Sequence, residues 1–277
     1  MMRNGINDAV KIHYGRQNLA DVILGALEES GADLKQLSVE ALAPIDEFHI
    51  RGRAATLELA GAAKLRSTDR VLDIGSGIGG TSRCLAQEFG CRVTGIDLTD
   101  EYCQVASTLT EMVGLDGLID YRQGDATNLP FEDNEFDVVW TEHVAMNIPD
   151  KRQFYSEMHR VLKPGGTLAI YDVLAGPSEP VLFPVPWART ADTSFLVSPE
   201  QLRNLLLNAG FTVSDWKDTT PEAREWFVNL ADRIRRDGFP KLGFHLLMGH
   251  DFREMAQNQG RNLQEGRITL GQIVSVK

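Results

Sequence analysis

The chain has 277 residues, of which 43% are hydrophobic, a size that suits one α/β core with additions or at most two small domains. Its 39 acidic residues outnumber its 28 basic ones and give a formal net charge of -11, which disfavours a nucleic-acid backbone as the partner. Three cysteines without C-x-x-C spacing, no metal-ligand cluster and no long apolar run predict a cytoplasmic protein without a disulfide, bound metal or membrane span.

Residues 1–66 are predicted to be mainly helical. Apolar side chains recur at helical spacing between residues 18 and 30, and residues 53–65 are rich in Ala and Leu. The intervening stretch 43–52 holds a proline, a terminal glycine and several charged side chains. Two interpretations are open for this stretch: a solvated loop anchored by Phe48, or a loop that closes over a ligand.

The stretch 71–80, VLDIGSGIGG, predicts a buried strand, a tight turn and the start of a helix. Its glycines allow positive φ and let backbone N–H groups at the helix N-terminus approach a ligand. Two cofactor classes fit: G-x-G-x-x-G is typical of nicotinamide and flavin enzymes, and D-x-G-x-G-x-G begins at Asp73. A purely structural turn is the third interpretation. An acid at the end of the strand favours a ligand with a cationic group and so the second spacing.

Strands and helices are then predicted to alternate as in an α/β sheet protein. A buried strand at 93–96 ends in Asp97, about twenty residues after the glycines, where an acid can accept hydrogen bonds from both hydroxyls of a ribose. Residues 141–148 follow the fourth strand at its C-terminal end, where open α/β sheets place their chemistry. The other predicted elements here are a helix at 101–113, strands at 119–122 and 136–140, a helix at 151–162 and a strand at 167–171.

Two long segments complete the chain. A proline-rich connection at 173–198 carries several aromatic side chains, and a connection of this length inside a compact domain is usually functional. A helix at 199–209 and a strand at 211–215 are predicted next. Residues 221–264 are predicted to be largely helical, before a final strand at 268–277.

Five stretches, DIGSGIG, GIDL, GDATNLPF, DVVWTEH and RVLKPGG, occur in this order with ordinary spacing. Together they resemble the motifs of the class I S-adenosylmethionine-dependent methyltransferases over residues 68–216, and the final strand extends the resemblance. The segment 52–56 and the ending EGRITLGQIVSVK are similar to the sarcosine/dimethylglycine, phosphoethanolamine and tocopherol groups of small-molecule methyltransferases. The resemblance implies a Rossmann-like α/β fold with a seven-stranded, mostly parallel sheet and an antiparallel final strand beside the sixth.

The resemblance also implies S-adenosylmethionine as the cofactor and assigns residues to it. Asp73 and the glycines would lie near its methionine part, Asp97 would bind the ribose, and Asp125 would accept from the adenine amino group. Several relatives have a histidine at the position of Asn147, whereas this chain places His143 one helical turn earlier. The full set of implied cofactor residues is Asp73, Gly75, Ser76, Gly77, Gly79, Asp97, Leu98, Asp125, Ala126 and Glu142.

The implied domain organisation is a helical lid segment at 1–66 and a methyltransferase domain at 67–277, with cap insertions at 173–198 and 220–266. Added segments of this kind roof a site over a small molecule rather than leave an open face for a polymer. The expected partner is therefore a small-molecule acceptor, with neither nucleic acid nor membrane, and formation of a homo-oligomer stays open.

Methyl transfer from a sulfonium is an in-line displacement that depends on alignment and on the exclusion of water. A base is needed only to make the acceptor nucleophilic. His143 is the first candidate, because an imidazole with a pKa near 6.5 can take a proton at neutral pH, and Tyr14 and His49 can reach the site from the lid. For each of them a structural hydrogen bond is the alternative role.

The sequence thus predicts an enzyme that transfers a methyl group from S-adenosylmethionine to a small molecule, with an amine favoured over a hydroxyl or thiol by the resemblance alone. Arg51, Arg53 and Arg189 can neutralise a carboxylate on such an acceptor. Two alternatives stay open. One is an NAD(P)-dependent oxidoreductase, which shares the glycine spacing, and the other is a non-catalytic cofactor-binding module, which Asn147 in place of a histidine would allow.

Overall fold

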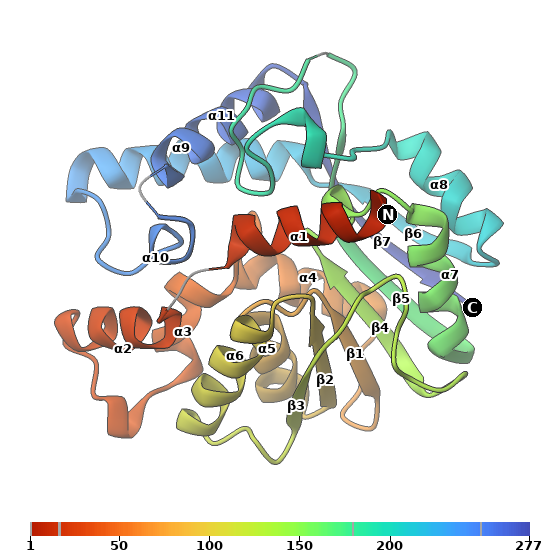
Figure 1. Cartoon of the computed structure of the whole chain (residues 1–277), viewed down its shortest axis with the longest axis horizontal. Coiled ribbons are helices and arrows are strands. Elements are labelled where there is room, and N and C mark those ends of the chain that lie inside the picture. Colours follow the sequence, from red (N-terminus) through yellow and green to blue (C-terminus); the bar gives the residue numbers. More distant parts are fainter. Residues whose placement is uncertain (1, 16–17, 179, 250) are drawn as a thin grey trace.

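The computed structural model describes residues 2–15, 18–178, 180–249 and 251–277; residues 1, 16–17, 179 and 250, which fall inside the expected lid and cap segments, lie outside this description. Within the described residues, seven strands form one sheet in the order β3-β2-β1-β4-β5-β7-β6 (Figure 1). The strands are β1 (Arg70–Ile74), β2 (Arg92–Asp97), β3 (Ile119–Gln123), β4 (Phe136–Glu142), β5 (Leu162–Ala175), β6 (Thr212–Asp218) and β7 (Ile268–Val276).

Strand direction follows the predicted pattern. β1 to β5 pair in parallel, and β7 pairs antiparallel with β5 on one side and with β6 on the other. The chain runs outward from β1 to β3 and then returns to β4 on the other side of β1, so the strand order reverses between β1 and β4. This topology confirms the predicted Rossmann-like sheet with an antiparallel final strand beside the sixth.

Helices connect the strands and extend the fold at both ends of the chain (Figure 1). Of those that follow β strands, α5, α6 and α7 make the crossovers that parallel pairing requires. The helices are α1 (Met2–Tyr14), α2 (Leu19–Glu29), α3 (Val39–Asp46), α4 (Arg53–Ala63), α5 (Gly80–Phe89), α6 (Asp100–Met112), α7 (Lys151–Val161), α8 (Pro199–Asn208), α9 (Thr220–Asp237), α10 (His245–Met248) and α11 (Phe252–Gln264), with short 3₁₀ turns η1 (Leu34–Gln36), η2 (Ala145–Asn147) and η3 (Ala191–Thr193).

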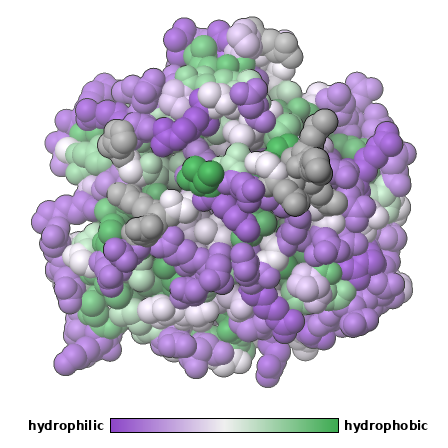
Figure 2. Space-filling view, in the orientation of Figure 1, coloured by the Kyte–Doolittle hydropathy of each residue, from purple (hydrophilic) through white to green (hydrophobic). Residues whose placement is uncertain are grey.

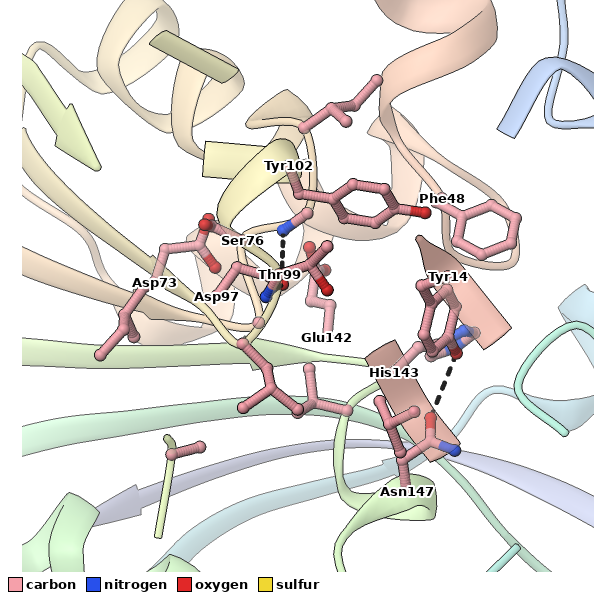
Figure 3. Close-up of a pocket in the computed structure, with 18 of the residues that line it drawn as sticks. Tyr14, Phe48, Asp73, Ser76, Asp97, Thr99, Tyr102, Glu142, His143 and Asn147 are labelled. Carbon is pink, nitrogen blue, oxygen red and sulfur yellow. Dashed lines mark hydrogen bonds between the residues drawn. The ribbon is translucent and has the colours of Figure 1, made fainter. Parts of the chain in front are cut away.

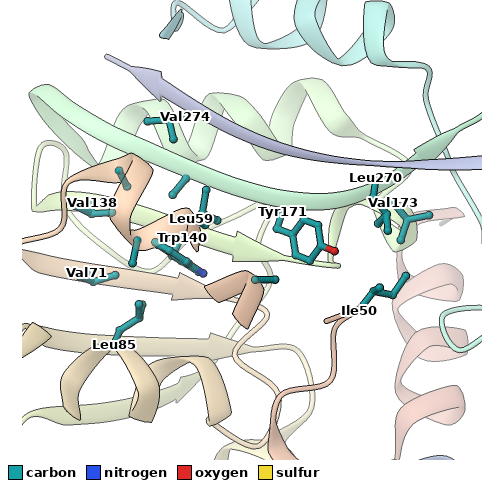
Figure 4. Close-up of a cluster of buried hydrophobic side chains, with 14 of the residues drawn as sticks. Ile50, Leu59, Val71, Leu85, Val138, Trp140, Tyr171, Val173, Leu270 and Val274 are labelled. Atoms are coloured by element: carbon teal, nitrogen blue, oxygen red, sulfur yellow. The ribbon is translucent and has the colours of Figure 1, made fainter. Parts of the chain in front are cut away.

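The sheet is buried on both faces because successive strand residues point to opposite sides. In β1, Val71 packs with Leu59 of α4 and Leu85 of α5, in the cluster drawn in Figure 4. Its neighbour Leu72 belongs to the cluster on the other face, which includes Met158 of α7 and residues of α8. The unbroken apolar strands of the sequence therefore correspond to a sheet covered by helices on both sides.

A third apolar cluster joins the two ends of the chain. Leu19, Ile23 and Leu27 of α2 are fully buried, and this cluster also contains Val105 of α6 and Leu247 of α10. In Figure 1, α1 crosses the middle of the view, between α2 and α3 on one side and α9 and α11 on the other. The N-terminal helices and the helices before β7 are thus packed together over one end of the sheet.

Two local expectations were wrong. The first part of the stretch 43–52 is not a loop, because α3 continues to Asp46 and contains Pro44. The side chain of Ser38 caps this helix by accepting from the Ala41 N–H, and Leu42 and Ile45 are fully buried, so packing offsets the hydrogen bond that a proline cannot donate. β5 also begins earlier than expected and includes the K-P-G-G turn, because Leu162 already pairs with Phe136.

The face of the molecule in Figure 2 is mainly hydrophilic, with hydrophobic side chains in small separate groups. Among the described residues, the large hydrophobic side chains that are exposed are Ile12, Leu207, Val228 and Phe239, which lie on three different helices and in a loop. No helix in the described part of the chain has the length and apolar character needed to cross a membrane.

Candidate active site

A cavity lies at the carboxyl ends of β1, β2 and β4, next to the point where the strand order reverses. This is the position where open α/β sheets bind their ligands. The cavity is roofed by α1, by the segment after α3 and by Leu247 of α10. Figure 3 shows Tyr14 of α1 and Phe48 of the segment after α3 at this roof. It brings together Tyr14, His49, Asp73, Gly75, Ser76, Gly77, Asp97, Leu98, Asp125, Ala126, Glu142 and His143 from the predicted site.

The glycine-rich turn between β1 and α5 forms one wall of this cavity. Gly75, Gly77 and Gly79 all have positive φ, of 75°, 54° and 89°. A Cβ on Gly77 would meet no atom within 4 Å, so this backbone faces open space, whereas one on Gly75 would collide with Val144. Gly79 alone among the predicted cofactor residues does not line the cavity; it precedes α5 and is packed against Tyr121.

Asp73 provides an acidic group at the floor of the cavity. Only 2% of the residue is exposed, and its Oδ2 accepts a hydrogen bond from the Ser82 hydroxyl at 2.6 Å. Burial raises the pKa of the Asp73 carboxyl to about 7, and the nearby carboxyls of Glu142 and Asp97 add to the rise. A cationic ligand group at this position would therefore be attracted to the carboxylate form.

Two further acids lie where the ribose and adenine were expected. Asp97 accepts from the backbone N–H of Gly77 and of Thr99, each at 2.9 Å, which ties the end of β2 to the glycine turn. Asp125 accepts from the Thr127 N–H at 2.8 Å and from the Asn7 side chain at 3.0 Å. Asn7 belongs to α1, so this helix reaches the expected adenine end of the cavity.

Glu142 anchors the segment that follows α3. Its carboxylate accepts from the Thr81 hydroxyl at 2.8 Å and from the Thr56 hydroxyl at 3.2 Å, and His49 Nδ1 lies 3.8 Å away. His49 Nε2 is 3.0 Å from the Gly52 carbonyl and 3.0 Å from the Thr56 hydroxyl. The His49 imidazole is therefore held in a structural network.

His143 differs from His49 in having an uncommitted ring nitrogen. Its backbone has φ of 54°, an uncommon conformation for a residue other than glycine, and its N–H donates to the Tyr171 carbonyl at 2.8 Å. Nε2 is buried and has no hydrogen-bond partner in the described part of the chain. Burial, with a contribution from the neighbouring His49, holds the pKa of His143 well below its usual 6.5. The ring is therefore neutral at physiological pH, and its unprotonated nitrogen can accept a hydrogen bond.

Tyr14 enters the cavity from the last turn of α1 (Figure 3). Its hydroxyl donates to Asn147 Oδ1 at 3.1 Å. Burial and the negative charge of Asp97 raise the pKa of Tyr14 above its usual value of 10, so this phenol stays protonated at physiological pH.

The three arginines considered for a substrate carboxylate do not line the cavity. Arg51 pairs with Glu58 at 2.7 Å, Arg53 pairs with Glu88 at 2.6 Å, and Arg189 pairs with Asp251. Each guanidinium thus already has a carboxylate partner elsewhere, which is a correction to the expected acceptor-binding role.

Sequence reasoning missed several residues at this site. Thr81 bonds to Glu142, Asn7 bonds to Asp125, and Tyr102 lines the cavity beside Tyr14. Thr81 directly follows the glycines, which is a weak local signal. No spacing in the sequence points to Asn7, because its partner is 118 residues away.

The fold and the cavity at its strand-order reversal define the class I methyltransferase architecture. Residues 72–170 match the family model described as a methyltransferase domain. The chain is 33% identical over 135 residues to the glycine/sarcosine/dimethylglycine N-methyltransferase of Actinopolyspora halophila, a match that covers 49% of this chain and 24% of that protein. It is 29% identical over 203 residues to the sterol 24-C-methyltransferase of Eremothecium gossypii, over 70% of this chain and 44% of that protein.

Among solved structures, the phosphoethanolamine N-methyltransferase 2 of Haemonchus contortus, in complex with phosphomonomethylethanolamine and S-adenosylhomocysteine, has the same fold. Its TM-score is 0.74 at 22% identity, over 98% of this chain and 60% of that one. The matches to the two curated relatives span less than half of those proteins' own length.

The chain therefore contains a class I S-adenosylmethionine-dependent methyltransferase domain, and its cofactor is S-adenosylmethionine. The cavity is compatible with this cofactor, because the three acids that the sequence predicts for its amino group, ribose and adenine, namely Asp73, Asp97 and Asp125, all line it. The buried Ser76 hydroxyl in the glycine turn also has no hydrogen-bond partner among the residues that the structure describes. The predicted methyltransferase domain and its cofactor are confirmed, and the nicotinamide interpretation is set aside.

Proposed function

We propose that the protein transfers the methyl group of S-adenosylmethionine to a small-molecule acceptor, and that an amine is favoured over a hydroxyl or a thiol. One observation carries the proposal: a single cavity joins the three acids Asp73, Asp97 and Asp125 to the neutral, unpartnered Nε2 of His143. The similarity to proteins named N-methyltransferases supports the amine. Another relative is named sterol 24-C-methyltransferase, a name that states methylation at carbon, so the acceptor atom is the part of the proposal that needs a test.

The cofactor supplies a methyl group on a sulfonium sulfur. Asp73 and Glu142 would hold its amino group, Asp97 its ribose hydroxyls, and Asp125 its adenine amino group. His143 would accept an N–H of the amine, because its imidazole is neutral and its Nε2 has no other partner. Excluding water from the sulfonium favours transfer over side reactions.

The division of the chain into a lid at 1–66 and a domain at 67–277, with caps at 173–198 and 220–266, belongs to this proposal. Tyr14 and Phe48 from the first segment and Leu247 from the last one line the cavity, which supports a roof built from those segments. Such a roof suits a small acceptor that is enclosed during the reaction and released when the roof opens. A cytoplasmic location stays a prediction.

Two measurements test the proposal. Titration calorimetry should detect binding of S-adenosylmethionine and of S-adenosylhomocysteine to the protein, and no binding of NADPH, the control ligand. A panel of amines, phenols, thiols and carboxylates, incubated with methyl-labelled cofactor, should then yield a labelled amine. Labelling of a phenol or a thiol alone would contradict the amine preference. Cofactor binding without any labelled product, in the panel or in a cell extract, would instead favour the non-catalytic cofactor-binding module.

A further inference from the structure

The carboxamide of Asn147 joins three separate parts of the roof. It lies in η2, directly after β4, and the residue is 8% exposed. Its Nδ2 donates to the Trp187 carbonyl at 2.7 Å and to the Thr193 carbonyl at 3.1 Å, both in the connection after β5. Its Oδ1 accepts from the Tyr14 hydroxyl of α1 at 3.1 Å, the bond drawn in Figure 3. All of its amide hydrogens are therefore used.

These three bonds fix the direction of the Tyr14 hydroxyl. Backbone carbonyls only accept hydrogen bonds, so the nitrogen of the Asn147 carboxamide must face Trp187 and Thr193. The oxygen of the carboxamide must then face Tyr14, and it too can only accept. The single hydroxyl hydrogen of Tyr14 is therefore committed to Asn147, and the phenol oxygen of this cavity-lining residue keeps lone pairs that can only accept.

The surrounding contacts hold this arrangement in place. The Trp187 ring is buried and its Nε1 donates to the Ser194 hydroxyl at 3.0 Å. The Phe195 N–H donates to the Met146 carbonyl at 2.7 Å, which fastens the connection to η2 itself. His13 Nε2 lies 2.9 Å from the Pro186 carbonyl, so α1 contacts the same connection beside Tyr14.

We propose that Asn147 is a positioning residue which, by orienting the Tyr14 hydroxyl, makes this tyrosine a hydrogen-bond acceptor for an N–H of the methyl acceptor. The inference rests on the proposed function and narrows its substrate class to primary and secondary amines. Tyr14 does not act as the base, because an amide cannot relay a proton from it as an imidazole could, and because burial keeps the phenol protonated.

The bonding in the transfer step follows from this geometry. A neutral amine donates one N–H to the Tyr14 oxygen, and only a primary amine has a second N–H for Nε2 of His143. In both cases the nitrogen lone pair stays free to point at the methyl group. The lone pair forms the new C–N bond while the S–CH₃ bond breaks, and the electron pair of that bond stays on sulfur. The product leaves as a protonated amine that has gained one methyl group and still carries its N–H. A tertiary amine has no N–H for Tyr14 and is expected to react poorly.

Kinetics on paired amines test the substrate class. The probes are the best secondary amine of the panel and its N-methylated tertiary form, with sarcosine and dimethylglycine as the first pair. Wild type should prefer the secondary amine. Tyr14→Phe should raise the KM for the secondary amine about tenfold, because roughly one hydrogen bond is lost, and should reduce the preference for it over the tertiary amine. Asn147→Leu should do the same, and the double variant should be no worse than Asn147→Leu. Additive effects, or an unchanged KM in Tyr14→Phe, would overturn the inference.

The pH profile separates orientation from proton transfer. Because the proposed role of Tyr14 involves no change in its ionisation, Tyr14→Phe should keep the rise of rate with pH that deprotonation of the amine produces. Loss of that rise in Tyr14→Phe alone would identify Tyr14 as the base and contradict the assignment. Ser194→Ala is the matched control, because it removes a bond of the same connection without touching Tyr14 or Asn147.

A third measurement needs no acceptor. Amide hydrogen exchange of the full chain with S-adenosylhomocysteine bound should be faster in Asn147→Leu for both α1 and residues 185–193, and faster in Ser194→Ala for residues 185–193 only. If the amides of α1 exchange in Asn147→Leu at the same rate as in wild type, the link between these segments is refuted. If the panel yields no acceptor, the proposed function fails, while this measurement still decides whether Asn147 orients the roof.

Discussion

Replacing Asp73 by Asn should remove most of the pH dependence of cofactor binding. The Asp73 carboxyl is buried against the cavity floor with a pKa raised to about 7, and the amino group of the cofactor is a cation. The carboxylate form attracts this cation and the protonated form does not. Binding near neutral pH should therefore release a proton from wild-type protein, and the asparagine variant should bind without that release.

The size of the effect follows from the pKa. At pH 6, about one unit below it, roughly nine in ten ligand-free molecules carry a protonated Asp73, so the dissociation constant should be about tenfold higher than at pH 8. In Asp73→Asn at pH 8, loss of a hydrogen bond to a charged group should weaken binding by about 1.5–3 kcal/mol. Asparagine keeps the shape of the side chain and can still accept from Ser82.

Titration calorimetry with S-adenosylhomocysteine, from pH 5.5 to 8.5 in two buffers of different ionisation enthalpy, measures both the affinity and the released protons. Glu47→Gln is the control, because burial raises the Glu47 pKa to about 8 although this residue does not line the cavity. Glu47→Gln should keep the roughly tenfold difference in dissociation constant between pH 6 and pH 8. Two results would refute the assignment of the raised pKa to Asp73. One is an equal affinity of wild type for S-adenosylhomocysteine at pH 6 and pH 8, and the other is a pH dependence of this affinity in Asp73→Asn that matches wild type.

Three more predictions concern His143, Glu47 and Gly75. His143→Asn, chosen because asparagine tolerates positive φ, should lower kcat on the panel amine about 100-fold with little change in the dissociation constant of S-adenosylhomocysteine; an unchanged kcat would return His143 to a structural role. Because the pKa of Glu47 is raised from 4.5 to about 8, the free energy of unfolding of wild type should fall between these pH values by up to about 1.4 kcal/mol per pH unit. In urea unfolding, the stability of Glu47→Gln relative to wild type should therefore increase with pH through this window and stay constant above it. Gly75→Ala should cost about 1–3 kcal/mol in urea unfolding and weaken cofactor binding, because φ is 75° and the new methyl group would collide with Val144; wild-type stability would contradict this geometry.

The sequence predicted the elements of the sheet because their signals are local. Apolar residues such as Val71 and Leu72 sit side by side in a short run, and a strand that is buried on both faces needs such a run. The glycines after β1 also signal a turn by themselves, since positive φ at Gly75 and Gly77 is a property of the local backbone.

Local signals failed where packing decided the conformation. Pro44 indicated a loop, yet it lies inside α3, because the burial of Leu42 and Ile45 and the cap at Ser38 favour the helix. Periodicity says little about a residue whose conformation depends on side chains far away in the chain. The same limit explains why the sequence allows Arg51 a role at a substrate carboxylate, although in the fold this arginine pairs with Glu58.

The roles of the polar residues at the site depended most on the tertiary structure. The sequence ranks His143 above His49 only because His143 follows a strand end. The fold commits His49 to Gly52 and Thr56, and it leaves Nε2 of His143 without a hydrogen-bond partner among the described residues. In the sequence, Asn147 is only a departure from the histidine of several relatives. In the fold, it accepts a hydrogen bond from Tyr14, which lies 133 residues earlier. Composition and spacing determine which elements form, because they act over a few residues. The partners of a hydrogen bond and the pKa of a buried acid are set by groups that only folding brings together, and these decide what each side chain at the cavity can do.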